Sequence, residues 1–332
     1  MQNLPEKFDE TRLWEALRGF GVSPSRVTYA PVGFGDYHWT VTDEDGRPWF
    51  ATVSDLEHKE HCGQGAQAAL KGLRQAMDTA LALRDRDGLR FVVAPVAATD
   101  GGGPVLPLDA RYALTVFPHV PGRTGEFGQR LTEAERDRLL ALLAELHGRT
   151  PPETTPPADM EPPGLPGVRA ALAESEGPWS GGPFAEPARL LLREHEATLH
   201  ARLAEFEALV ARVKGRGAPL VVTHGEPHPG NLILGEEGYL LVDWDTVGLA
   251  PAERDLSLIS DDPADLARYA ELTGRTPDPD ALALYRLRWS LLDVAEFVEW
   301  FRAEHQRTQD TESAWKGFTD TLGQLAAGGS AA

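Results

Sequence analysis

Short stretches of β-branched and aromatic residues, separated by glycine turns, occupy most of the first 118 residues of the chain. Alternating apolar and polar side chains, and turn sequences such as Asp45-Gly46, are typical of antiparallel strands joined as hairpins. The strands that we expect are residues 26–32, 37–42, 48–53, 91–97 and 112–117. An amphipathic helix over residues 9–19, with Asp9 as its N-cap, precedes them.

Farther along the chain, apolar side chains recur every three or four residues, which predicts helices. One helix begins at Thr132, which forms a capping-box match with Glu135, and ends at His147-Gly148. The other expected helices, one of them before residue 118, are residues 65–84, 168–173, 187–213, 262–272, 278–301 and 312–325, with a shorter helix beginning at Pro251. The pattern therefore predicts an α+β fold, in which a strand-rich lobe is followed by a mostly helical lobe.

Proline and glycine interrupt this pattern at two places. Residues 117–122, Phe-Pro-His-Val-Pro-Gly, predict a boundary between a lobe at residues 1–118 and a lobe at residues 119–332. Residues 150–167 are too rich in proline for a helix or a central strand. We expect a loop there, either ordered against the protein or mobile.

Composition narrows the classes of partner. The formal net charge of −19 opposes binding to nucleic acid, and the single cysteine, Cys62, excludes an internal disulfide framework or a multi-thiolate zinc site. No apolar run approaches the ~18–20 residues that a membrane span needs, and the first residues do not resemble a signal segment. We expect a cytoplasmic protein, monomeric or homodimeric, with no nucleic-acid or membrane partner.

Polar side chains gather in residues 220–245. A hairpin of residues 231–234 and 239–242 would bring Glu226, Asn231 and Asp243 to one end of a small sheet. Oxygen atoms that converge in this way suit a hard divalent cation and a proton acceptor, which are the groups that phosphoryl transfer needs.

The spacing of this stretch resembles the catalytic loop and metal strand of the aminoglycoside phosphotransferase family. The matching pattern is His224-x-Glu226, four residues, Asn231, and then a strand that ends at Asp243. The resemblance implies a two-lobed protein-kinase-like fold, with a nucleotide-binding lobe at residues 1–118 and a catalytic and substrate lobe after it. It implies that Asn231 and Asp243 hold Mg²⁺. It also implies that Glu226 and Asn231 form the catalytic pair, although the family has aspartate where this chain has Glu226.

The same resemblance implies that ATP or GTP is the phosphoryl donor. Its phosphates would lie at Gly33 and Gly35, and its base at the hinge that begins with Phe117, where His119 or the residue after it supplies an N–H group. Thr52 stands where the family has a phosphate-binding lysine, and the helix of residues 65–84 contains no glutamate to pair with one. The two absences agree, because either charge alone would be costly to bury. The basic residues nearby that can take over are Lys59, His61, Lys71 and Arg74.

Other polar residues have supporting or open roles. By the resemblance, Asp255 supports the catalytic loop, and we expect His224 to brace it through hydrogen bonds. Asp245 follows the metal strand and either contacts the metal or substrate or pins the loop. Asp293, Glu296 and Glu299 form a row on one helix face, which either binds amino groups of a cationic substrate or is a solvated surface.

We therefore predict an O-phosphotransferase that moves the γ-phosphoryl group to a hydroxyl of a small molecule, with an aminoglycoside or another antibiotic as substrate. The acidic charge either attracts a cationic substrate of this kind or serves only to keep the protein soluble. Two alternatives stay open: a nucleotide-binding pseudokinase or regulatory protein with little turnover, and a metabolite kinase for a choline- or homoserine-like substrate. A zinc site at His224, Glu226 and His228 is disfavoured, because the intervening prolines prevent the helix that such spacing needs.

Overall fold

The computed structural model describes residues 1–5, 8–174, 176–235 and 238–328. By its internal contacts the chain divides into two compact units. Unit 1 comprises Met1–Ala158 and Leu220–Thr276, and unit 2 comprises Asp159–Pro219 and Pro277–Ala332. The expected boundary near residue 118 lies inside unit 1, and the two lobes stay a prediction.

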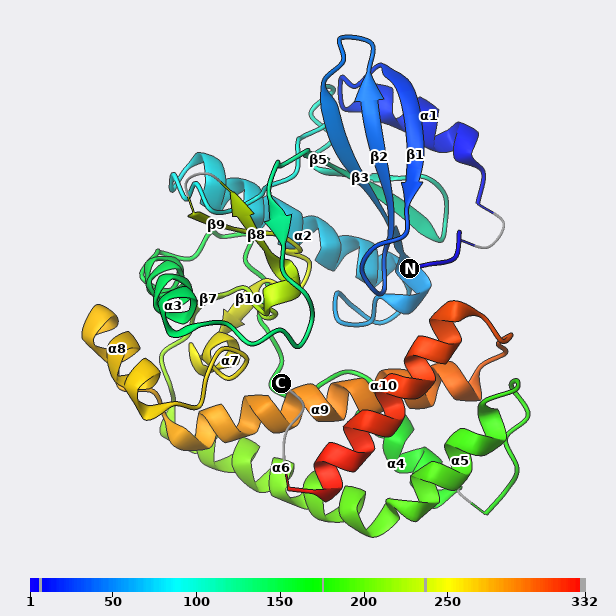
Figure 1. Cartoon of the computed structure of the whole chain (residues 1–332), viewed down its shortest axis with the longest axis vertical. Coiled ribbons are helices and arrows are strands. Elements are labelled where there is room, and N and C mark those ends of the chain that lie inside the picture. Colours follow the sequence, from blue (N-terminus) through cyan, green and yellow to red (C-terminus); the bar gives the residue numbers. More distant parts are fainter. Residues whose placement is uncertain (6–7, 175, 236–237, 329–332) are drawn as a thin grey trace. The chain divides into compact units, whose positions relative to one another are not determined.

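An antiparallel sheet with the strand order β1-β2-β3-β5-β4 forms the first part of unit 1 (Figure 1). Its strands are β1 (Pro24–Ala30), β2 (Tyr37–Asp43), β3 (Pro48–Asp55), β4 (Val105–Pro107) and β5 (Tyr112–Pro118). Helix α1 (Glu10–Gly19), capped by Asp9 as expected, contributes Leu13 and Leu17 to a core shared with Trp39 of β2. The alternation of the sequence therefore predicted the first three strands within about two residues at each end.

The prediction of a strand at residues 91–97 is wrong. Val92 makes only an isolated bridge to Leu241, and Val96 then donates a backbone hydrogen bond of 2.8 Å to Val116 of β5. Pro95 stands between these contacts and has no N–H group. The segment therefore passes from one sheet to another without forming a ladder with either.

Two smaller sheets complete the strands of unit 1. β7 (Val221–Thr223) pairs with β10 (Gly248–Ala250), and β8 (Leu232–Gly235) lies between β6 (Arg123–Thr124) and β9 (Gly238–Leu241). The hairpin expected in this stretch is confirmed, although residues 236–237 of its turn lie outside the described residues. The helical elements of unit 1 besides α1 are η1 (Leu56–His58), α2 (Ala66–Asp85), α3 (Glu133–His147), η2 (Pro229–Asn231), α7 (Glu253–Leu256) and α8 (Pro263–Thr273). The capping box at Thr132 and Glu135 is present at the start of α3.

The described part of unit 2 consists of helices around one apolar core. They are α4 (Leu165–Ala173), α5 (Ala185–Glu194), α6 (Glu196–Arg216), α9 (Pro279–Arg302) and α10 (Gln309–Ala326). The prediction of a single helix over residues 187–213 is wrong. The helix is interrupted at His195, where φ is −99° and ψ is 9°. No glycine or proline marks this break, so helical periodicity alone does not reveal it. No helix in the described part of the chain is long and apolar enough to cross a membrane.

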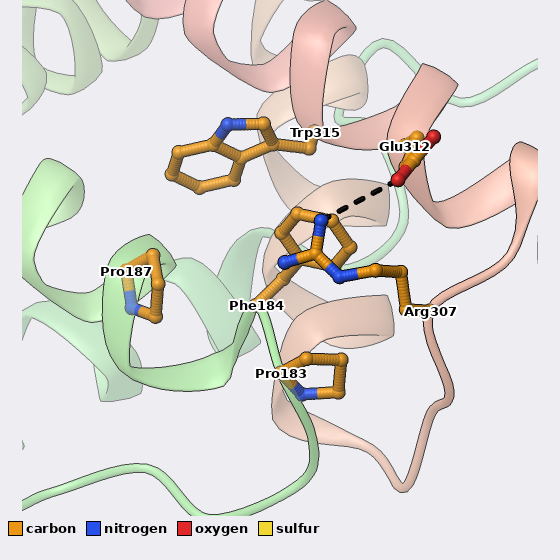
Figure 2. Close-up of a pocket in the computed structure, with 6 residues that line it drawn as sticks. All are labelled: Pro183, Phe184, Pro187, Arg307, Glu312 and Trp315. Carbon is orange, nitrogen blue, oxygen red and sulfur yellow. Dashed lines mark hydrogen bonds and ion pairs between the residues drawn. The ribbon is translucent and has the colours of Figure 1, made fainter.

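Unit 2 contains a pocket of about 430 Å³ (Figure 2). Its lining residues are Pro183, Phe184, Pro187, Arg307, Glu312 and Trp315. The guanidinium of Arg307 lies 4.7 Å from the centre of the Phe184 ring and pairs with Glu312 at 3.4 Å, as Figure 2 shows. The one carboxylate among these lining residues, that of Glu312, is already paired, and most of the other lining residues are proline or aromatic. The pocket therefore offers no set of oxygen ligands for a metal ion.

Candidate active site

His224 fixes the start of the loop of residues 224–231, which follows β7 and is the expected catalytic loop. Its ring is buried, with Nε2 2.9 Å from the carbonyl oxygen of Val242 and Nδ1 accepting the N–H of Glu226 at 3.2 Å. Because a carbonyl only accepts and an N–H only donates, the ring is neutral with its proton on Nε2. Burial lowers the pKa of His224 to about 4, which agrees with that neutral form.

Asp255, on α7, holds the main chain of the same loop. Its carboxylate accepts the N–H of His224 at 2.8 Å and the N–H of Gly225 at 2.7 Å, and it lies 3.0 Å from Nε2 of His147. Burial alone would raise the pKa of Asp255, but the hydrogen bond and charge of His147 hold it below the ordinary value. A fully buried carboxylate with three donors anchors the loop rigidly.

Gly225 allows the loop to approach its support closely. Its φ is +102°, and a Cβ atom there would lie 2.4 Å from a guanidinium nitrogen of Arg254. That guanidinium donates to the hydroxyl of Thr223 and to the carbonyl oxygen of Thr246, each at 2.8 Å. Only glycine fits both the backbone conformation and the space.

Asn231 is oriented by hydrogen bonds at the end of η2. Its amide nitrogen lies 3.0 Å from the carbonyl oxygen of Glu226 and 3.4 Å from Nε2 of His228. The main-chain carbonyl group of Asn231 accepts the N–H of Val242 at 3.0 Å, which ties the loop to the end of the β8–β9 hairpin. With the amide nitrogen engaged, the side-chain oxygen Oδ1 is the atom that Asn231 can offer to a cation.

Asp243 has a backbone conformation that is unusual for a residue with a side chain. Its φ is +64°, the one positive value among the non-glycine residues of the described chain. The preceding residue, Val242, is held through both its N–H and its carbonyl group, by Asn231 and His224, so the chain must turn at Asp243. Such a conformation persists only where the surroundings impose it.

Three other carboxylates act on the carboxylate of Asp243. Asp243 keeps an exposed surface, yet partial desolvation and the charges of Asp245, Glu226 and Asp36 raise its pKa well above the ordinary value. The hairpin thus brings three of the expected residues, Glu226, Asn231 and Asp243, to one place, with Asp245 beside them. Asp36, from the glycine turn, adds a carboxylate for which the spacing of the sequence held no signal.

Lys59 is a buried cation within this acidic cluster. Its Nζ lies 2.9 Å from both carboxylate oxygens of Asp36 and 2.7 Å from Oδ2 of Asp245, and its side chain is only 5% exposed. Although burial opposes charge, Asp245 and Asp36 raise the pKa of Lys59. Burial would also raise the pKa of Asp245, but Lys59 and His61, whose Nε2 is 3.1 Å away, hold it well below the usual range. The sequence offered Lys59 and His61 among four nearby basic residues, and only the structure selects them.

The expected nucleotide-binding residues lie on the five-stranded sheet or in the segments that adjoin its strands. Gly33 and Gly35 have φ of +71° and +95°, so the turn between β1 and β2 needs glycine at both positions. The hydroxyl of Thr52 lies 3.2 Å from Nδ1 of His38 on the neighbouring strand. Phe117 is near the end of β5, and the N–H of His119 points to the carbonyl oxygen of Pro48 at 3.4 Å.

The remaining expected residues lie elsewhere. Asp293, Glu296 and Glu299 are on α9 in unit 2, whereas the catalytic loop belongs to unit 1. Among the described residues, no group of three or more His, Cys, Asp and Glu side chains forms a ready-made metal site. Mg²⁺ needs few protein ligands when phosphates and water supply the rest, so the oxygens of Asn231 and Asp243 fit this ion.

Comparisons with known proteins bear on the family and the fold of the chain. Residues 26–285 match the phosphotransferase enzyme family. Protein StrN of Streptomyces griseus is 29% identical over 260 residues, which cover 72% of this chain and 74% of that protein.

Solved structures show a similar fold over the whole chain. A spectinomycin phosphotransferase in complex with ADP and spectinomycin has a TM-score of 0.72 at 19% identity, covering 97% of this chain and 99% of its own. The choline kinase LicA of Streptococcus pneumoniae has a TM-score of 0.60 at 13% identity, with coverage of 96% and 99%. The kinase-like fold class expected from the sequence, an antiparallel sheet together with a mostly helical part, is thereby confirmed. The chain belongs to the phosphotransferase enzyme family and has the fold of small-molecule kinases.

Proposed function

We propose that this protein is an ATP-dependent O-phosphotransferase for a small molecule that carries a hydroxyl group. The observation that supports this most strongly is the joint placement of Asn231, Asp243 and Glu226. The main-chain carbonyl group of Asn231 accepts the N–H of Val242, the residue just before Asp243. Glu226 lies on the loop that His224 and Asp255 hold in place by hydrogen bonds. This is the set of groups that phosphoryl transfer requires.

In the proposed reaction the hydroxyl oxygen of the substrate forms a bond to the γ-phosphorus, and the bond from that phosphorus to the β,γ-bridging oxygen breaks, releasing ADP. Glu226 orients the hydroxyl and accepts its proton. Asn231 and Asp243 would hold Mg²⁺, which supplies positive charge to the phosphates. Glu226 carries one more methylene group than aspartate, so the hydroxyl must bind correspondingly farther from the main chain.

The nucleotide is proposed to bind under the glycine turn. Gly33 and Gly35 allow backbone N–H groups to approach phosphate oxygens, as in other kinase-like proteins. At the hinge after Phe117, the N–H of His119 is turned toward Pro48, so the N–H of Val120 is better suited to the base. GTP is the alternative donor.

A cationic antibiotic is the substrate class that we favour. The acidic cluster and the net charge of −19 attract amines, and the spectinomycin phosphotransferase similar to this chain is in complex with spectinomycin. The row of Asp293, Glu296 and Glu299 on α9 remains a predicted surface for substrate amino groups, whereas the carboxylate of Asp245 already pairs with Lys59 and His61. The choline kinase similar to this chain supports a metabolite kinase as the second candidate.

An ATP-consumption screen tests the proposal. The purified chain would be supplied with Mg-ATP or Mg-GTP and tested against spectinomycin, other aminoglycosides, macrolides, choline and ethanolamine. We expect ADP release that depends on one of these hydroxyl compounds, with a phosphorylated product detected by mass spectrometry. Stabilisation by Mg-nucleotide without turnover on any compound would instead indicate the pseudokinase. The absence of any thermal shift with either nucleotide would contradict the proposed function altogether.

A further inference from the structure

Lys59 is a buried cation to which the family spacing assigns no role. It lies just after η1, and its Nζ contacts Asp36 at 2.9 Å and Asp245 at 2.7 Å. An ammonium group removed from water is stable only when carboxylates compensate for the lost hydration. Its partners come from two segments more than 200 residues apart in the sequence, which only the tertiary structure brings together.

The position of this ammonium group coincides with the expected path of the nucleotide phosphates. Asp36 directly follows the turn that contains Gly33 and Gly35, and Asp245 lies two residues beyond Asp243. Because Nζ touches both carboxylates, Lys59 lies where the glycine turn meets the metal strand. In kinase-like phosphotransferases the phosphates lie between these two segments.

The contacts of Lys59 also suit a phosphate ligand in charge. Its ammonium group already lies between two carboxylates, those of Asp36 and Asp245, and a nucleotide would bring further negative charge to the same place. Thr52, on β3, has its hydroxyl 3.2 Å from Nδ1 of His38 and carries no positive charge. A lysine side chain is a long, flexible point charge, so it can reach the same place from another backbone position.

We infer that Lys59 is the cation that binds the nucleotide phosphates in this protein, reaching them from the turn after β3. Asp36 and Asp245 hold the ammonium group in place until nucleotide binds, and Asp36 then competes with phosphate for it. Asp36 is therefore a positioning residue, whereas Lys59 contacts the nucleotide itself. This inference rests on the proposed function, because it requires a nucleotide in the site.

A nucleotide series separates a phosphate ligand from a structural ion pair. Isothermal titration calorimetry with Mg²⁺ would measure the affinity of adenosine, AMP, ADP and a non-hydrolysable ATP analogue. In Lys59→Met we expect about a 10- to 100-fold loss for ADP and the ATP analogue, since a hydrogen bond from a charged group is removed. Adenosine affinity should stay within about threefold, because adenosine has no phosphate for the ammonium group to contact. Lys316→Met, which removes an exposed lysine of α10 in unit 2, is the control and should change neither affinity.

Asp36→Asn provides a second, opposite test. It breaks one of the two ion pairs that Lys59→Met removes but keeps the ammonium group, so the ratio of ADP to adenosine affinity should be unchanged or higher. If Lys59 were only a structural clamp, both variants would lose affinity for ADP and adenosine alike, and the inference would be wrong. Should Lys59→Met fail to fold, the Asp36→Asn ratio decides, since a lower ratio than in the unmodified protein contradicts the inference.

The same experiment distinguishes this inference from the proposed function. An unmodified protein that binds none of the four ligands would contradict both. Nucleotide binding whose phosphate dependence is the same in Lys59→Met as in the unmodified protein would contradict the role of Lys59 alone.

Discussion

The catalytic loop with its metal strand and the segment from β3 to α2 both contribute to the acidic cluster of unit 1, but they differ in how closely they follow the family pattern. In the first region, Asn231 and Asp243 stand at the family spacing, with one substitution at Glu226. In the second, Thr52 replaces the expected lysine, α2 has no glutamate, and Lys59 supplies the charge from another position.

The difference follows from what each group must do. A metal ligand must place an oxygen atom at a defined distance and angle, and here Val242, His224 and Asn231 fix the backbone that does so. A phosphate-binding ammonium group is a point charge at the end of a flexible side chain. Its backbone position can therefore move while its charge stays, whereas the metal ligands cannot move in this way.

The largest effect that would test this comparison is expected at Asp243. Asp243→Asn removes the charged metal ligand, and we expect Mg²⁺-dependent nucleotide binding to be abolished and turnover to fall by about 10³-fold or more. Calorimetry with and without Mg²⁺ measures the first effect and ADP release the second. Asp261→Asn, at an exposed position, is the control. Retained Mg²⁺ dependence in Asp243→Asn would show that the metal strand is as replaceable as β3.

Glu226 tests the substituted position of the catalytic loop. Glu226→Gln removes the proton acceptor but keeps the size of the side chain, so turnover should fall by about 10²-fold or more. Nucleotide affinity should be nearly unchanged, because Glu226 acts on the substrate hydroxyl. Glu44→Gln, in an exposed turn, is the control for the loss of one charge. Equal turnover in Glu226→Gln and the unmodified protein would exclude Glu226 from the chemistry.

His224 tests the rigidity of the loop through pH. Its pKa is about 4 in the folded protein, below the ordinary value of 6.5, so the unfolded chain binds a proton that the folded protein does not. The free energy of unfolding should therefore fall as pH falls from 6.5 to 4, by about 3 kcal/mol from this residue. Urea denaturation across this range should show a weaker pH dependence for His224→Gln. Identical profiles would mean that the ring is not held in its neutral form.

The smallest effect is expected at Thr52. Thr52→Lys restores the lysine at the family position, but Lys59 already provides the cation, so ADP affinity should change by less than about threefold. Thr40→Lys, at an exposed position of β2, controls for the added charge on the sheet. A tenfold gain for Thr52→Lys alone would reveal an unfilled cation position on β3 and would reverse the comparison.

The sequence by itself determined the features that depend on residues close together in the chain. The first three strands, the capping box at Thr132, the hairpin after Asn231 and the spacing of Glu226, Asn231 and Asp243 all follow from local turn chemistry and periodicity. The family pattern is readable in this region because its residues lie within 18 positions of one another along the chain, from Glu226 to Asp243.

Only the tertiary structure decided the features that join distant segments. It selected Lys59 by placing Asp36 and Asp245 around it, and it paired Asp255 with His147, 108 residues away. It also divided residues 91–97 between two sheets and broke the helix at His195, where the local sequence has no breaker. Buried charges and interruptions of helices and strands depend on which groups become neighbours after folding. The periodicity of the sequence does not contain that information.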